Sequence, residues 1–232
     1  MRKKQVGAMV ISGFALLAVL GTAHQGLAQE ATTTYSRMAP IEQYLMDRTA
    51  EIALARTAAP ESISRDAAVM VLGRRGFETA NEGKNGFVCI VERGWTAAAE
   101  PDFWNPKVRV PICDNAAAAR SYLLRSLKTT ELVLAGRTKT QIEEDIVAAV
   151  QKKELPAMEP GAMCYMMSKE GYGGDAAPHW PSHVMFFFSG VASASWGANV
   201  PGSPVMAVSD DREKLTEFAV ALGHWSDGTE AR

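Results

Sequence analysis

The first 28 residues constrain this chain most, because they have the three-part pattern of a secretory signal peptide. Residues 2–4 (Arg-Lys-Lys) form a basic start, residues 6–20 are mainly apolar, and the small-x-small sequence Gly-Leu-Ala at 26–28 precedes Gln29. A membrane-spanning helix needs about 20 predominantly apolar residues, and glycine and hydroxyl residues interrupt this run. The pattern therefore predicts cleavage after residue 28 rather than a retained membrane anchor.

Cleavage at that point leaves 204 of the 232 residues, a length that suits a single domain with its own hydrophobic core. The first 28 residues hold three of the 24 Lys and Arg and none of the 26 Asp and Glu, which leaves a net charge of −5. Such mild acidity argues against nucleic acid and anionic membranes as partners. We expect a periplasmic or extracellular protein that meets a membrane only through the signal peptide before its cleavage.

All three cysteines follow the predicted cleavage site, and export would place them where disulfides form and persist. Cys89 lies in an apolar run, and Cys113 follows an extended stretch at 108–112. The intervening segment is rich in Trp and Pro, and a disulfide would stabilise it by closing the loop. We expect Cys89 to pair with Cys113, although spacing alone does not fix connectivity. Cys164 is then a buried apolar residue or a reactive thiol.

A flexible arm is expected at 29–38, and a single domain follows it over 39–232. A helix is predicted from Pro40 to about Ala58, ahead of Pro60. Apolar runs at 67–72 and 87–93 are predicted to be paired strands, and residues 94–113 a long ordered loop.

Two central helices follow in the prediction. Asp114 is expected to cap the first, which runs to about Lys128. A capping box from Thr140 to Glu143 is expected to open the second, which Pro156 ends.

The C-terminal third changes to short apolar runs, which predict strands at 162–167, 184–188 and 204–208. Residues 214–225 fit a strand or a helix, and the neighbouring strands favour the strand. The expected fold class is α+β, with an N-terminal helix, a central helix pair and a mostly antiparallel sheet built from residues 67–93 and the C-terminal third.

The Gly-rich stretch 171–183 holds the one candidate metal constellation, formed by Asp175, His179 and His183. Two imidazoles and a carboxylate are ligands for a divalent metal. The spacing is not that of a helical zinc motif, because Pro181 separates the histidines. The alternative is structural, with each polar side chain bonding within its own loop.

Four tryptophans in predicted loops or element ends indicate a binding surface instead, because aromatic faces with a polar handle are used in recognition. The structural alternative is that these rings fasten irregular loops to the core. The four residues are Trp95, Trp104, Trp180 and Trp196.

No sequence motif of a hydrolase, a phosphate-binding loop or a dinucleotide-binding protein occurs in the chain. We therefore expect a non-enzymatic protein of the cell envelope, without a cofactor, that binds a small molecule, a glycan or an envelope protein. The alternative is a metal-binding protein or metal-dependent hydrolase that uses Asp175, His179 and His183, and the residues leave open whether the chain is an enzyme.

Overall fold

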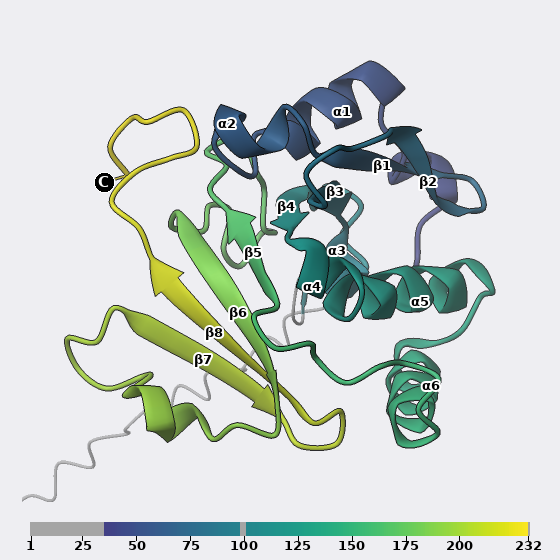
Figure 1. Ribbon diagram of the computed structural model, residues 1–232. Coiled ribbons are helices and arrows are strands. Elements are labelled where there is room, and N and C mark those ends of the chain that lie inside the picture. The colour runs from purple at the N-terminus through teal and green to yellow at the C-terminus, as the bar shows by residue number, and fades with distance from the viewer. Residues whose placement is uncertain (1–34, 98–100, 232) are drawn as a thin grey trace, which may run out of the picture. The chain divides into compact units, whose positions relative to one another are not determined.

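Within the described residues of the computed structural model, 35–97 and 101–231, eight strands form one sheet with helices on both faces (Figure 1). The predicted signal peptide (1–28) and positions 29–34 of the predicted arm lie outside these residues. The strand order is β2-β1-β3-β4-β5-β6-β8-β7. The strands are β1 (Ala68–Gly73), β2 (Gly76–Asn81), β3 (Val88–Glu92), β4 (Val110–Asp114), β5 (Met163–Met166), β6 (His183–Ser189), β7 (Val205–Asp210) and β8 (Leu215–Ala221).

The sheet is antiparallel throughout except between β1 and β3, so the fold is α+β with a mostly antiparallel sheet, as the sequence predicts. Residues 214–225 contain the strand β8 and not a helix. The α-helices are α1 (Arg48–Arg56), α2 (Glu61–Ser64), α3 (Gly94–Ala97), α4 (Ala116–Ala119), α5 (Tyr122–Leu134) and α6 (Lys139–Gln151), and the 3-10 helices are η1 (Ile41–Gln43) and η2 (Ser193–Trp196).

The strands predicted at 67–72 and 87–93 pair as β1 and β3, as the sequence predicts. They run parallel, because the segment between them forms an additional strand, β2, which returns antiparallel along the outer edge of β1. The sequence of β2, Gly-Phe-Glu-Thr-Ala-Asn, has no buried residue and lacks an apolar run, so hydrophobicity did not indicate this strand. The predicted loop 94–113 also contains α3 and ends in β4.

Three predicted helix starts are shifted. The α-helix predicted from Pro40 begins at Arg48, because the Asp47 side chain accepts the N–H of Ala50. Asp114 is the last residue of β4 rather than a cap, and Asn115 caps α4. At α6 the capping box joins Thr138 and Gln141, two residues before the predicted one.

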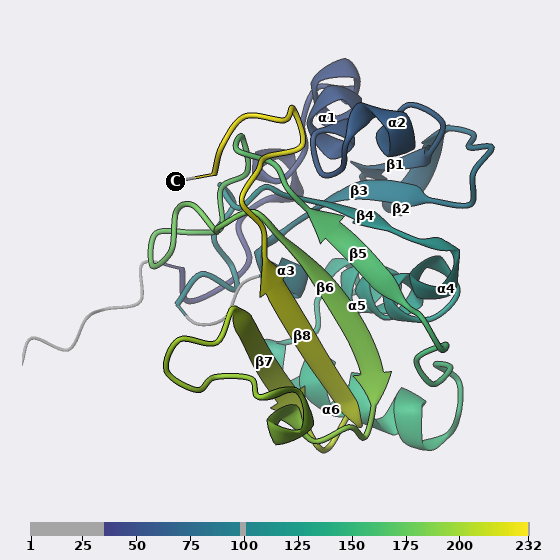
Figure 2. The ribbon, with the colours of Figure 1, turned by 60° about the vertical axis from the view of Figure 1, so that its left-hand side comes forward.

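The sheet separates two apolar layers. On one face, α1 packs over β1, β3 and β4 around Ala55, Val69 and the Cys89–Cys113 disulfide. On the other face, α4 and α5 cover Ile90 and Ile112 through residues such as Tyr122 and Leu123. Figure 2 shows α5 and α6 behind the strands β5, β6, β8 and β7. Helices therefore enclose the central strands from both sides.

A third cluster joins α5 and α6 to the loop after α3, with Trp95, Trp104, Val133 and Ile146 among its members. Tyr35 and Met38, which belong to the predicted arm, pack against this cluster. None of the helices within 35–97 and 101–231 is long and apolar enough to cross a membrane.

Candidate functional site

The Gly-rich stretch 171–183 is held in place by a buried carboxylate from a distant loop. Asp102 is 2% exposed, and its carboxylate accepts the backbone N–H groups of Asp175 and Ala176, each at 3.0 Å. Burial alone would raise the pKa of Asp102, but the N–H donors of Ala176, Asn105 and Asp175 lower it below its usual value. The charged form of Asp102 thus holds the stretch against the loop that follows α3.

Two glycines in this stretch lie where a side chain has no room. A Cβ at Gly174 would lie 2.5 Å from the carboxylate carbon of Asp102, and φ of Gly174 is +127°. A Cβ at Gly173 would lie 2.5 Å from Nε1 of Trp180. These close contacts let the Trp180 indole and the Asp102 carboxylate pack directly on the backbone, which orients the rest of the stretch.

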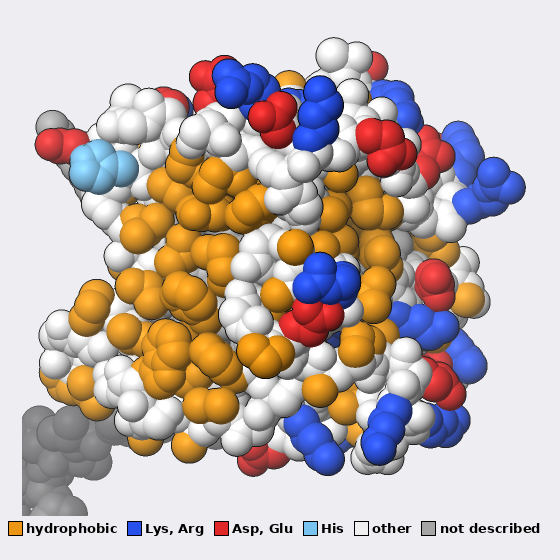
Figure 3. All heavy atoms as spheres, in the orientation of Figure 1, with side chains coloured by type: hydrophobic (Ala, Val, Ile, Leu, Met, Phe, Trp, Pro, Cys, Tyr) orange, Lys and Arg blue, Asp and Glu red, His pale blue; other side chains and the backbone are white. Residues whose placement is uncertain are grey.

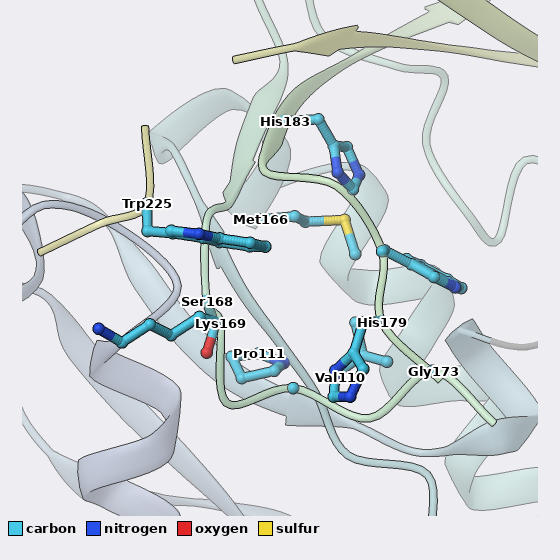
Figure 4. Close-up of a pocket in the computed structure, with 11 residues that line it drawn as sticks. Val110, Pro111, Met166, Ser168, Lys169, Gly173, His179, His183 and Trp225 are labelled. Atoms are coloured by element: carbon cyan, nitrogen blue, oxygen red, sulfur yellow. The ribbon is translucent and has the colours of Figure 1, made fainter. Parts of the chain in front are cut away.

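A narrow pocket opens between this stretch, the ends of β4, β5 and β6, and the C-terminal segment. Its enclosed volume is about 30 Å³, and the space within it reaches about 360 Å³ when the open mouth is included. Figure 4 shows the Trp225 ring and the Met166 thioether projecting into this space, with His183 on one side and His179 on the other. We call it the Trp225 pocket, and its main lining residues are Val110, Met166, His179, Trp180, His183 and Trp225.

His183 begins β6 and presents a hydrogen-bond acceptor to the pocket. Its Nδ1 lies 2.6 Å from the carbonyl oxygen of Pro181, and since a carbonyl only accepts, Nδ1 carries the proton. Burial lowers the pKa of His183 below its usual value, so the imidazole is neutral at pH 7 and Nε2 keeps its lone pair. Among the described residues, none hydrogen-bonds Nε2.

Trp225 reaches the pocket because the chain after β8 folds against β5 and β6. The backbone N–H of Ser226 donates to the carbonyl of Met167 at 2.9 Å, and the hydroxyl of Ser182 donates to the carbonyl of His224 at 2.5 Å. Ser182 is fully buried in this contact, so its hydroxyl serves the structure and does not face the pocket.

The cationic residue at the pocket, Lys169, is already neutralised. Its ammonium forms an ion pair with Asp227, and Figure 4 shows the Lys169 side chain extending away from the centre. The hydrogen bonds from Lys169 and Thr229 hold the pKa of Asp227 well below its usual value. The interior of the pocket is therefore apolar and aromatic with neutral polar groups.

The residues of the predicted metal constellation are not gathered in one place. His179 and His183 line the same pocket, but the Asp175 carboxylate accepts the hydroxyls of Tyr35 and Tyr172 instead. Within 35–97 and 101–231 there is no group of three or more His, Cys, Asp or Glu residues that could hold a metal ion.

The four predicted recognition tryptophans have different environments. Trp95 and Trp104 are 3% and 8% exposed and belong to the core, where Nε1 of Trp95 donates to Thr130 at 3.0 Å. Trp180 lines the Trp225 pocket. Trp196 is 39% exposed and stacks on Phe218, within the area over β6 and β8 where hydrophobic side chains gather in Figure 3.

The cysteines are arranged as the sequence predicts. Cys89 and Cys113 are register partners on β3 and β4 and form a disulfide. Cys164 is free and fully buried in β5, and burial raises its thiol pKa well above the usual value. A buried thiol that resists ionisation is not a nucleophile, so Cys164 acts as a packed apolar residue.

The sequence reasoning missed Trp225 and Met166, which complete the pocket. Trp225 ends the segment 214–225, for which the sequence left strand and helix open, and Met166 lies in the apolar run 162–167 that predicts a strand. Their convergence with His183 depends on the pairing of β5, β6 and β8. No protein-family model, curated protein or solved structure matches this chain, so its function is argued from its own residues.

Proposed function

We propose that this protein is an exported, non-enzymatic domain of the cell envelope that binds the sugar ring of a glycan in the Trp225 pocket. Export is supported by the signal-like residues 1–28 and by the disulfide, a bond typical of oxidising compartments. Pockets for small ligands combine apolar walls with a few oriented polar groups, and this pocket has that composition.

The observation that carries the proposal is the meeting of Trp225, Met166 and the neutral His183 in a pocket whose lysine, Lys169, is already paired with Asp227. A sugar ring has an apolar C–H face and a rim of hydroxyls. The C–H face suits an indole and a thioether, because aromatic faces attract the positive edges of their partners. A hydroxyl of the rim donates to Nε2 of His183.

The experiment is a calorimetric titration of the protein with N-acetylglucosamine at pH 7, comparing two tryptophan variants. Trp225→Ala removes the ring from the pocket, and Trp196→Ala removes a tryptophan that does not line it. We expect Trp225→Ala to weaken binding at least tenfold, because a stacked aromatic ring contributes on the order of 1 kcal/mol beyond its buried area. Trp196→Ala should leave the affinity unchanged.

A second arm tests the histidine. Protonation of Nε2 of His183 removes its acceptor, and burial keeps the pKa of this imidazole below its usual value of 6.5. The affinity should therefore hold between pH 8 and pH 7 and fall as the pH is lowered stepwise below 6.5. Equal affinities of the two tryptophan variants, or no heat of binding with the parent protein at millimolar sugar, would contradict the proposed site.

A further inference from the structure

A second pocket lies between α5, the end of α6 and the β7–β8 hairpin, on a part of the molecule that the Trp225 pocket does not use. It holds about 850 Å³ of empty space, counting its mouth. Its walls are largely apolar and come from Val150, Leu155, Met158 and Leu215. We call it the α5–α6 pocket. Such walls suit an alkyl chain rather than a polar ligand.

Three basic side chains line this apolar pocket. Arg125 comes from α5, Lys153 follows α6, and Lys214 precedes β8. Glu213 is the single acidic residue of the lining, and it forms an ion pair with Arg125. The lining residues therefore carry two more positive than negative charges, which favours an anion at the pocket.

Both lysines have a backbone conformation that favours glycine. Lys153 has φ of +60° and Lys214 has φ of +53°, and Asn199 is the only other described non-glycine residue with positive φ. Lys153 ends α6 at the position where glycine is the usual residue, with the N–H of Glu154 bonded to the carbonyl of Ala149. A lysine in this conformation costs about 1 kcal/mol relative to glycine. Such strain at two sites that share a pocket indicates that the side chains are needed there.

Arg125 has donor capacity that the protein does not use. Its Nε is buried and has no hydrogen-bond partner among the described residues. Glu92 and Glu217 lie near Arg125, but burial raises the pKa of both, to about 7 for Glu92, so these carboxyls resist ionisation. The Glu213 carboxylate occupies the place that the anionic group of a ligand would take beside Arg125.

We propose that the α5–α6 pocket binds a medium-chain fatty acid, with its alkyl chain against the apolar walls and its carboxylate beside Lys153 and Lys214, since Glu213 already pairs with Arg125. This is a site separate from the Trp225 pocket and does not depend on the glycan proposal. A single alkyl chain suits the apolar lining, and one carboxylate offsets one of the two surplus positive charges.

The test is a calorimetric titration of the protein with decanoate, below its micelle-forming concentration, at pH 7. The double variant Lys153→Gly/Lys214→Gly removes both charges and places glycine where the backbone favours it. We expect this variant to melt at the same temperature as the parent or higher, and to bind decanoate at least tenfold more weakly. Lys152→Gly, which removes the neighbouring lysine outside the lining, should bind like the parent.

Two further outcomes decide the chemistry. Decanol has the same chain without the charge and should bind at least tenfold more weakly than decanoate. Parent-like binding by the double variant, equal binding of decanol and decanoate, or no binding of decanoate would overturn the proposal. A lower melting temperature of the double variant would also contradict it, because the lysines would then serve the fold.

Discussion

The central and C-terminal strands of the one sheet differ in how they are covered. β4 is buried at all five positions, with α1 over one face and α4 and α5 over the other. β7 has no buried residue, and Val208 is 70% exposed. The comparison shows that burial is concentrated in the doubly covered strands, whereas β7 leaves its side chains accessible, and we infer that the doubly covered strands contribute more to stability.

Both proposed pockets lie where these two regions meet. The Trp225 pocket combines Val110 of β4 with His183 of β6 and the segment after β8. The α5–α6 pocket combines Arg125 of α5 with Lys214 at the β7–β8 hairpin. The doubly covered region thus supplies one wall of each pocket, and the less covered C-terminal region supplies the other.

The largest predicted effect concerns the buried ion pair of the central region. Glu51 and Arg93 are 1% and 0% exposed, and their side chains meet at 2.8 Å. Glu51→Ala leaves the Arg93 guanidinium buried without its counter-charge, which should lower the free energy of unfolding by about 3–5 kcal/mol. Urea denaturation of the two proteins measures this difference.

The matched change in the C-terminal region is Thr216→Val. Thr216 is 3% exposed in β8, and its hydroxyl donates to the carbonyl of Val191 at 2.6 Å. The same hydroxyl lies 3.2 Å from the hydroxyl of Ser209, so the variant loses two neutral hydrogen bonds, which should cost about 1–2 kcal/mol. Equal losses of unfolding free energy for Thr216→Val and Glu51→Ala would contradict the proposed difference between the two regions.

A smaller change in the free energy of unfolding is expected from pH, through two buried carboxyls of the central region. Burial raises the pKa of Glu92 to about 7, and burial together with the Glu92 charge raises that of Asp114 well above its usual value. The folded protein therefore keeps protons that the unfolded chain has lost above about pH 4.5. These carboxyls favour the folded state at low pH, and this contribution falls as the pH rises through 7.

Unfolding free energies at pH 6.5 and 8.5 test this direction. His183, whose usual pKa is 6.5 and whose folded pKa is lowered by burial, titrates in the unfolded chain over part of this range and acts in the opposite direction. The carboxyl contribution is therefore read from the difference between the parent and the Asp114→Asn variant. A shift of Glu92 from 4.5 to about 7 corresponds to roughly 3 kcal/mol in total, of which only the part above pH 6.5 is measured. Asp114→Asn should reduce the pH dependence, because it removes a carboxyl whose pKa is raised in the folded state. The change should break no hydrogen bond, because neither oxygen of Asp114 has a hydrogen-bond partner among the described residues. A parent protein more stable at pH 8.5 would contradict the assignment.

The strands of the C-terminal third could be predicted because short apolar runs indicate them locally. The Cys89–Cys113 pair could be predicted because the signal-like residues 1–28 led us to expect a disulfide. β2 could not, because its polar sequence forms a strand only through pairing with β1. The shift of the first helix start has a local cause instead, since the Asp47 cap competes with the earlier Pro40 signal.

The candidate site could be predicted only in part. The Gly-rich stretch identified His179, Trp180 and His183, which line one pocket. Asp175 was grouped with them by proximity in sequence, but Tyr35, 140 residues away, binds its carboxylate. Trp225 joins the site through the order of β5, β6 and β8, which no local pattern encodes.

In the proposed function, a sugar ring bridges β5, β6 and the segment after β8 at the Trp225 pocket. Amide hydrogen exchange of the protein, with and without saturating N-acetylglucosamine, measures whether a ligand joins these segments. We predict slower exchange in residues 166–183 and 222–226 and unchanged exchange in β1 and β2. Unchanged exchange in both pocket segments, or slowing confined to the β7–β8 hairpin, would contradict the proposed function.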